Sequence, residues 1–253
     1  MTGRLILIAA AVLFTAGAAW AQSEQSTPLP RTSFSADEKR DVERIVRDYL
    51  LTHPEIIVRA LQTFEANQKV AAETRARRLV AENLSRLEPV GPEYVAGNPD
   101  GDVTVFEFFD YRCPYCKRSF PGLMKTIKKD GNVRLVLKEF PILGQDSVLA
   151  ARAALAAGAQ GRYIEMHEAL MQVNGAFTEE RILDIAADQG LDIERLADDM
   201  YRPKVDDMIR RTYDLARTLE IRGTPAFVVG TEMIPGAVDG ERLKALIAKA
   251  RSG

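Results

Sequence analysis

The apolar positions divide the chain into a helical N-terminal part and a longer part in which strands and helices alternate. Ser35 and Glu38 have the spacing of a capping box, and apolar residues follow at intervals of three and four. This pattern predicts a first helix over residues 36–51. Thr52 begins a second capping signature, and the lack of Gly and Pro over residues 55–88 predicts a second helix over residues 54–87, with Thr52 as N-cap.

The second predicted helix carries an apolar stripe only in its first turns. Residues 68–78 are mostly Ala, Glu, Lys and Arg, so this stretch has no face that a protein core would bury. At about 1.5 Å per residue the helix would be a stalk about 50 Å long. The stripe predicts packing against the same stripe of another copy, and the alternative is a two-helix hairpin in a monomer. Its members are Ile56, Ile57, Ala60, Leu61 and Phe64.

The second part of the chain has the pattern of an α/β domain. A short edge strand is predicted over residues 94–96, and buried strands over residues 103–109 and 133–138. A helix between the two buried strands makes them a parallel strand–helix–strand unit. The pattern is then helical over residues 146–220, with Thr178 and Asp192 predicted as N-caps of two of the helices. Two short strands and a last helix over residues 239–251 complete an α/β fold.

Composition shifts suggest where the parts begin and end. Residues 1–21 read as a signal peptide with an Ala-x-Ala site cleaved near Ala21, and the alternative is an uncleaved membrane anchor. Residues 22–35 are a flexible lead, residues 36–88 the stalk, and residues 89–253 the α/β domain with its helical insert at about residues 146–220.

Export and charge restrict the classes of partner. A cleaved signal peptide places the mature protein outside the reducing cytosol, where disulfides form and persist. The whole chain has 34 basic and 36 acidic residues, and loss of Arg4 with the signal leaves 33 against 36, a formal charge of −3. This mild balance gives no reason to expect nucleic acid or an anionic membrane as a partner.

Cys113 and Cys116, the two cysteines of the chain, follow directly after the strand at residues 103–109, at the predicted start of a helix. Unpaired N–H groups and partial positive charge at a helix N-terminus stabilise a thiolate, so the pKa of Cys113 should be low and Cys113 should be the nucleophile. Cys116 lies one turn deeper and suits the resolving role in thiol–disulfide exchange. Pro114 at the first turn loses no useful hydrogen bond.

Two alternatives to redox chemistry remain for the cysteine pair. A closed zinc site needs about four Cys or His ligands, and His53 and His167 are far away in sequence, so we expect no metal ion and no other cofactor. An inert structural disulfide fits poorly with the strand-then-helix placement. His167 lies in the helical insert and is interpreted as a structural or surface residue.

Several stretches together resemble the DsbA-like periplasmic thiol–disulfide oxidoreductases of the thioredoxin superfamily. They are residues 103–116, the Lys-Glu-Phe-Pro-Ile-Leu-Gly segment at 138–144, the helical insert and Gly-Thr-Pro at 223–225. Residues 36–87 are further similar to the suppressor of copper sensitivity protein C branch, whose N-terminal helices can assemble trimers. The resemblance implies a thioredoxin fold with a helical insertion, preceded by a long helical stalk.

The resemblance also implies roles for single residues. Cys113 would form the mixed disulfide, Cys116 would resolve it, and Pro225 would be a cis-proline facing the pair. Thr224 would bind the backbone of an extended substrate. Glu107 matches the buried acidic residue that moves protons to and from the second cysteine, and burial would raise its pKa.

The two residues between the cysteines, Pro114 and Tyr115, are predicted to contact substrate. Tyr115 occupies the position where the strong oxidant DsbA has His. A neutral Tyr stabilises the thiolate less, so we expect a less depressed pKa at Cys113 and a less oxidising pair.

These features favour a disulfide isomerase or reductase that acts on exported cysteine-containing proteins. Isomerisation gains from several active sites around one cavity, which a trimeric stalk would provide. The alternatives are a DsbA-type dithiol oxidase and a copper-binding module, because thiolates suit Cu(I). A DsbD-like membrane reductant would serve the isomerase, and a DsbB-like oxidant would serve the oxidase.

Overall fold

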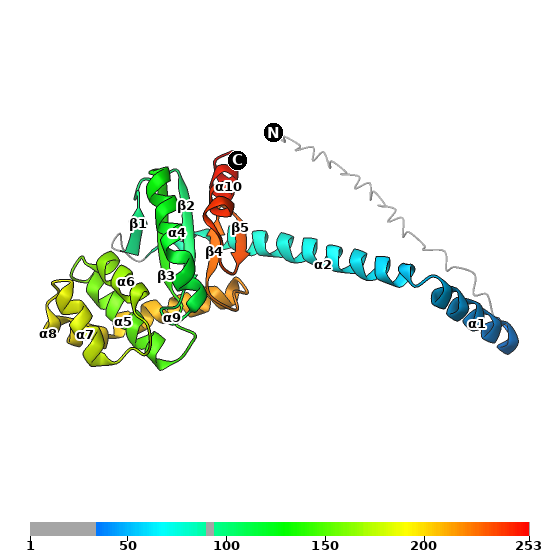
Figure 1. Ribbon diagram of the computed structural model, residues 1–253, viewed down its shortest axis with the longest axis horizontal. Coiled ribbons are helices and arrows are strands. Elements are labelled where there is room, and N and C mark those ends of the chain that lie inside the picture. Colours follow the sequence, from blue (N-terminus) through cyan, green and yellow to red (C-terminus); the bar gives the residue numbers. More distant parts are fainter. Residues whose placement is uncertain (1–33, 90–93, 253) are drawn as a thin grey trace, which may run out of the picture. The chain divides into compact units, whose positions relative to one another are not determined.

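The computed structural model describes residues 34–89 and 94–252 (Figure 1). The predicted signal peptide and most of the flexible lead lie outside these residues. The described part of the chain divides into two compact units, with the division between residues 60 and 61. No helix among the described residues has the length and apolar character needed to cross a membrane.

The first helix, α1 (Ala36–Thr52), begins at the predicted capping box. The Ser35 N–H donates to Glu38 Oε2 at 2.8 Å, and the Glu38 N–H donates to Ser35 Oγ at 3.3 Å. The prediction that Thr52 caps a second helix is wrong. Thr52 is the last residue of α1, and its hydroxyl donates to the Asp48 carbonyl at 2.8 Å, which a hydroxyl in a final helical turn can reach four residues back.

The second helix, α2 (Glu55–Glu82), ends earlier than the sequence pattern predicts. Asn83 breaks the helix with φ −123° and ψ 16°, and α3 (Leu84–Leu87) follows it. The Asn83 side chain donates to the Leu79 carbonyl at 2.8 Å, so it competes with the backbone for a helical acceptor. One helix through residue 87 is therefore a wrong prediction.

The described residues form one sheet of five strands in the order β1-β3-β2-β4-β5. β2 and β3 are parallel and are connected by α4 (Pro114–Asp130), while the other neighbouring pairs are antiparallel. The predicted strand–helix–strand unit is confirmed. The strands are β1 (Val95–Gly97), β2 (Val103–Phe109), β3 (Val133–Glu139), β4 (Ala226–Val229) and β5 (Glu232–Pro235).

Alternation along β2 sends its side chains to two different cores. Val105 and Phe109 belong to the core that contains Cys116 and the apolar side of α4 and of α10 (Gly240–Arg251). Phe106 and Phe108 belong to the core on the other face, which also holds Val80, Leu87 and the end of α9 (Pro203–Thr218). Position 107 lies between Val105 and Phe109 in this alternation, so its side chain faces the layer that carries the cysteines.

The helical insert forms a layer beside the sheet, where Figure 1 shows α5 to α8 gathered together. Thr178 and Asp192 cap the helices that follow them, as predicted, through N–H donors of Arg181 at 3.2 Å and Arg195 at 3.0 Å. The residues of α5 from Ala150 to Ala157 are almost all buried, and their small side chains allow close packing against α6 and α8. The helices are α5 (Gln145–Gly158), α6 (Tyr163–Gln172), α7 (Glu179–Asp188) and α8 (Ile193–Met200).

Candidate active site

The turn between β2 and α4 is held by the side chain and backbone of Asp110, which is 1% exposed. Its carboxylate accepts the Arg112 N–H at 2.7 Å, the Leu143 N–H at 2.9 Å and the Ser147 hydroxyl at 2.7 Å. Its carbonyl accepts the Cys113 N–H at 3.0 Å. These bonds fix where α4 begins relative to the sheet.

Cys113 is the N-cap of α4, and no disulfide joins Cys113 to Cys116. The Cys113 sulfur accepts the N–H of Cys116 at 3.4 Å, and in its protonated form it donates to the Thr224 carbonyl at 3.2 Å. Pro114 occupies the first turn, as the sequence predicts. The nucleophile candidate is thus held between a helix N-terminus and the segment before β4.

The two thiols have opposite electrostatic environments. The pKa of Cys113 is lowered to about 5, first of all by the hydrogen bond with the Cys116 thiol. Hydrogen bonds with Thr224 and with the backbone N–H groups of Tyr115 and Cys116 also lower this pKa, while burial opposes the shift. Burial raises the pKa of Cys116, and the Cys113 thiol and the Glu107 charge raise it further. Cys113 is 3% exposed and Cys116 is fully buried. At neutral pH the pair is therefore one thiolate near the surface and one buried thiol.

Glu107 is fully buried on β2, as its position in an apolar strand predicts. Neither carboxylate oxygen has a hydrogen-bond partner among the described residues. Burial, and then the Cys113 charge, raise the pKa of Glu107 to about 8. A buried carboxyl that titrates near neutral pH beside Cys116 can exchange protons with that thiol.

The Thr224-Pro225 peptide bond is cis, and this segment faces Cys113 across the site. The Pro225 carbonyl accepts the Gly236 N–H at 2.9 Å. Thr224 is half-buried, so part of it remains open to an incoming chain. The predicted facing of the cysteines and the Gly-Thr-Pro segment is present, while the substrate-binding role of Thr224 stays a prediction.

Pro114 and Tyr115 lie on the surface beside Cys113, and the Tyr115 side chain is 58% exposed. The guanidinium of Arg118 lies 4.5 Å from the centre of the Tyr115 ring. Both positions are available to a substrate, and their contact with one stays a prediction.

Sequence reasoning missed two polar groups that hold the site in place. Asp110 organises the turn, and Lys117 donates from Nζ to the carbonyls of Leu170 at 3.2 Å and Met171 at 3.3 Å, at the end of α6. The insert is thereby tied to α4 one residue after Cys116. The position of Asp110 just before the cysteine motif was a usable signal, whereas Lys117 has no partner near it in sequence.

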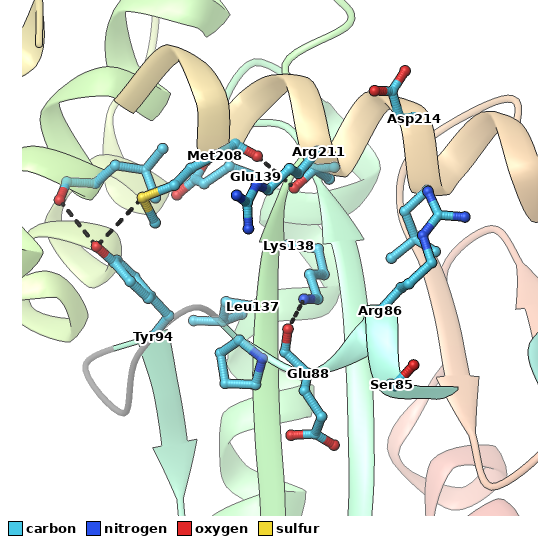
Figure 2. A pocket seen from close by; sticks show the side chains of 14 residues that line it. Ser85, Arg86, Glu88, Tyr94, Leu137, Lys138, Glu139, Met208, Arg211 and Asp214 are labelled. Carbon is cyan, nitrogen blue, oxygen red and sulfur yellow. Dashed lines mark hydrogen bonds between the residues drawn. The ribbon is translucent and has the colours of Figure 1, made fainter. Parts of the chain in front are cut away.

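A cavity of about 580 Å³ lies elsewhere, between β3, α9 and the segment after α2 (Figure 2). Neither cysteine lines it, nor does Thr224 or Pro225. Lys138 donates from Nζ to the Glu88 carbonyl at 3.1 Å, and burial lowers the pKa of Lys138 to about 8. This cavity is separate from the thiol site. The described residues contain no group of three or more His, Cys, Asp or Glu side chains placed to hold a metal ion.

The cis-proline, the N-cap thiolate and the buried acid on a central strand define a dithiol site of the thioredoxin-fold class. Residues 104–248 match the model of the DSBA-like thioredoxin domain, and residues 38–71 match the copper resistance protein ScsC N-terminal domain. The first match covers more than half of the chain, which therefore belongs to the family of DsbA-like thioredoxin-domain proteins. The resemblance read from the sequence is confirmed.

Solved structures extend the likeness. A thioredoxin-like oxidoreductase from Silicibacter pomeroyi DSS-3 is 48% identical, covers 63% of this chain and 92% of its own, and superposes with a TM-score of 0.61. BcfH of Salmonella enterica Typhimurium is 29% identical, covers 85% of this chain and 96% of its own, and superposes with a TM-score of 0.73. A curated relative, the Na(+)/H(+) antiporter NhaA 1 of Salinispora arenicola, is 30% identical over 186 residues. These residues span 71% of this chain and only 28% of the antiporter.

Proposed function

We propose that this protein is a periplasmic thiol:disulfide interchange protein that isomerises or reduces the disulfides of exported proteins through Cys113 and Cys116. The observation that carries the proposal is the asymmetry of the two thiols. Both thiols are buried, but the pKa of Cys113 is lowered to about 5 whereas the pKa of Cys116 is raised. Only one sulfur is therefore an available nucleophile at neutral pH.

The geometry supports a two-step exchange. The Cys113 thiolate attacks one sulfur of a substrate disulfide, the S–S bond breaks, and the other substrate sulfur leaves as a thiolate. In isomerisation this thiolate attacks another substrate disulfide, and Cys113 is later displaced as a thiolate with no net oxidation. In reduction the carboxylate form of Glu107 takes the proton of Cys116, and the Cys116 sulfur attacks Cys113. The second substrate sulfur then also leaves as a thiolate, and the pair becomes a disulfide.

The pKa of Cys113 bears on the direction of the reaction. A stabilised thiolate favours the reduced pair and so makes the disulfide a stronger oxidant. The value of about 5 lies between roughly 7 for thioredoxin and roughly 3.5 for DsbA. An intermediate value fits a pair less oxidising than DsbA, as the exposed, uncharged Tyr115 suggests.

The N-terminal helices support a homo-oligomer, and we favour a trimer. No described residue of α1 is buried, although the helix is strongly amphipathic. On α2, the side chains of Ile57, Leu61 and Phe64 are 46%, 56% and 60% exposed and follow one another at helical spacing. We propose that another copy of the chain covers this stripe.

The experiment that tests the function is light scattering on the mature protein, paired with refolding of a scrambled-disulfide substrate. We expect an oligomer that repairs the scrambled substrate and depends on a DsbD-like reductant. Leu61→Glu should give a monomer that keeps dithiol reductase activity but loses most isomerase activity, since charge on the stripe opposes packing. Gln62→Glu, an exposed neighbour on α2, is the matched control and should leave both unchanged.

Oligomers of Leu61→Glu would contradict the stalk assembly. Point substitution is preferable to removal of residues 22–87, because Val80 and Leu87 are fully buried in the core behind the sheet. A monomeric wild type that oxidises reduced substrate and leaves scrambled substrate unrepaired would identify a DsbA-type oxidase, served by a DsbB-like oxidant.

A copper-binding role is the second candidate, favoured by the match of residues 38–71 to a copper resistance protein domain. Cys113 and Cys116 together offer two soft sulfur ligands, which fit Cu(I). Titration of the reduced protein with Cu(I) separates this role from exchange. Tight binding of one ion, lost in Cys116→Ser and without disulfide turnover, would support it over the enzyme.

A further inference from the structure

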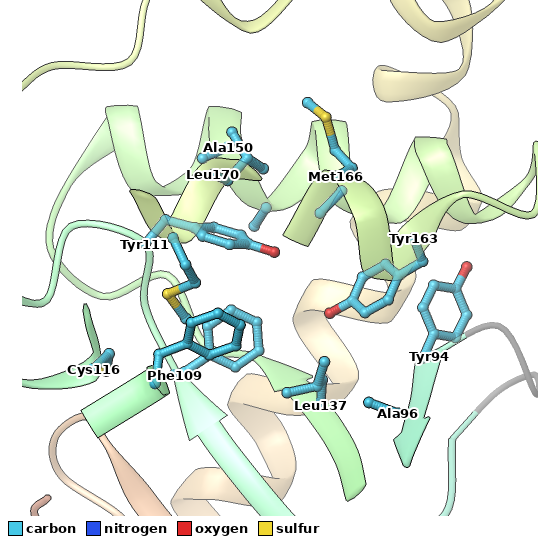
Figure 3. Packing of buried hydrophobic residues seen from close by; sticks show 14 of the residues in the cluster. Tyr94, Ala96, Phe109, Tyr111, Cys116, Leu137, Ala150, Tyr163, Met166 and Leu170 are labelled. Carbon is cyan, nitrogen blue, oxygen red and sulfur yellow. The ribbon is translucent and has the colours of Figure 1, made fainter. Parts of the chain in front are cut away.

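Four polar side chains form a buried cluster beside the thiol site. Tyr111, Glu139, Tyr163 and His167 are between 1% and 3% exposed. Tyr111 lies in the turn before Cys113, Glu139 ends β3, and Tyr163 and His167 belong to α6 of the insert. Figure 3 shows the hydroxyl groups of Tyr111 and Tyr163 pointing into the same space between the sheet and α6. The exchange mechanism above uses none of the four.

Glu139 Oε1 is the centre of the cluster. It accepts the Tyr111 hydroxyl at 2.9 Å and the Tyr163 hydroxyl at 2.8 Å. The Tyr111 oxygen also lies 2.9 Å from Nδ1 of His167. Since the single Tyr111 proton goes to Glu139, the Nδ1–H of His167 must be the donor in the second bond.

The protonation of His167 agrees with this assignment. Burial lowers the pKa of His167 to about 3, so the ring is neutral and carries one proton. The other ring nitrogen, Nε2, has no hydrogen-bond partner among the described residues, and the rings of Phe109 and Phe120 lie against the imidazole. The bond to Tyr111 is therefore the one that orients this histidine.

The two tyrosines differ in what else they fix. Tyr163 is the first residue of α6 and donates to Glu139, and a side-chain hydrogen bond between Tyr163 and Tyr111 also shifts the pKa of each, but Tyr163 has no bond to His167. Tyr111 lies next to Asp110, whose carbonyl accepts the Cys113 N–H at 3.0 Å. The Tyr111 hydroxyl is hydrogen-bonded to Glu139 on the sheet and to His167 on the insert. A shift of the Tyr111 side chain would therefore move the turn that positions the Cys113 sulfur.

We propose that Tyr111 is a positioning residue for the Cys113 thiol, acting through its hydroxyl bridge between Glu139 and His167. The bridge holds the turn so that the Cys113 sulfur stays 3.4 Å from the Cys116 N–H and 3.2 Å from the Thr224 carbonyl. The inference deepens the proposed exchange function and rests on it. Through His167, the helical insert then also contributes to the pKa of Cys113.

The test compares Tyr111→Phe with Tyr163→Phe in the full chain, because both remove a buried hydroxyl bonded to the same oxygen. Thiolate absorbance at 240 nm against pH measures the pKa of Cys113, and glutathione equilibration measures the redox potential. We expect Tyr111→Phe to raise the pKa of Cys113 by about one unit, about a tenfold fall in the thiolate-to-thiol ratio. Tyr163→Phe should lose stability and leave the thiol titration unchanged.

Equal shifts in the two variants, or none in either, would overturn the proposal. If Tyr111→Phe does not fold, His167→Phe removes the insert side of the bridge alone, and an unchanged pKa of Cys113 in that variant would overturn it as well. The titration needs no substrate. A wild type without exchange activity would therefore refute the proposed function, while the two tyrosine variants would still decide the role of Tyr111.

Discussion

Cys113→Ser should abolish thiol–disulfide exchange, with a loss of more than about 1000-fold in the reduction of a disulfide substrate. The nucleophile is the thiolate, and with a pKa of about 5 Cys113 is almost wholly ionised at neutral pH. A serine hydroxyl at the same N-cap keeps the contacts with the helix but stays protonated. The rate is measured with a fluorescent disulfide substrate and glutathione as reductant.

Cys116→Ser is the matched control, because it removes the other sulfur of the same motif. We expect Cys116→Ser to trap an intermediate, whereas Cys113→Ser should not react at all. Cys113 should still attack, and without a resolving thiol the protein should accumulate as mixed disulfides, seen as higher bands on non-reducing gels. A Cys113→Ser protein with wild-type activity, or mixed disulfides formed through Cys116 alone, would end the assignment of Cys113 as the nucleophile.

The parts of the site that could be predicted from sequence are those that depend on neighbours along the chain. A period of two in residues 103–109 places position 107 on the face of Cys116, and the apolar flanks ensure that Glu107 is buried. A strand that runs into Cys-Pro-x-Cys predicts Cys113 at a helix N-terminus. Thr178 and Asp192 were found as caps for the same reason, since capping acts within four residues.

The parts that could not be predicted depend on contacts between residues distant in sequence, or on competition between alternative local hydrogen bonds. Tyr111 meets Glu139 28 positions later and His167 56 positions later, and no pattern of spacing indicates either contact. At Asn83 the side chain and the backbone compete for one carbonyl, so a run of good helix formers did not prevent the break. Thr52 ends the preceding helix and does not cap the following one, because its hydroxyl bonds to a carbonyl of the preceding helix.

Glu107→Gln should change the pH dependence of stability, and the sign follows from two opposed titrations. Cys113 has a pKa lowered from 9.0 to about 5. Its stabilising contribution to the free energy of unfolding is therefore complete above pH 9 and is lost as the pH falls toward 5. Glu107 has a pKa raised from 4.5 to about 8, so the folded protein binds the extra proton and loses stability as the pH rises between these values. In the reduced protein the two slopes oppose one another from about pH 5 to 8.

The oxidised protein separates the two titrations, because the disulfide removes the Cys113 thiol and leaves Glu107. Burial is the first cause of the Glu107 shift, so the acid should keep a raised pKa in this form. The slope of a single group is about 1.4 kcal/mol per pH unit, which allows up to about 5 kcal/mol between pH 4.5 and 8. Oxidised wild type should therefore unfold at lower urea concentration as the pH rises. Oxidised Glu107→Gln should show a smaller fall, because it loses Glu107 but keeps the buried Glu139, whose pKa is also raised.

Urea denaturation of both oxidised proteins at pH 5 and pH 8 measures the difference, with the exposed Glu65→Gln as a matched control that should follow wild type. Parallel pH curves for wild type and Glu107→Gln would mean that Glu107 ionises without the cost of burial. A carboxylate with a pKa below 5 would be too weak a base to take the proton of Cys116, whose pKa is raised. That outcome would remove Glu107 from the resolving step and leave Cys116 to be deprotonated by solvent or by the departing substrate thiolate.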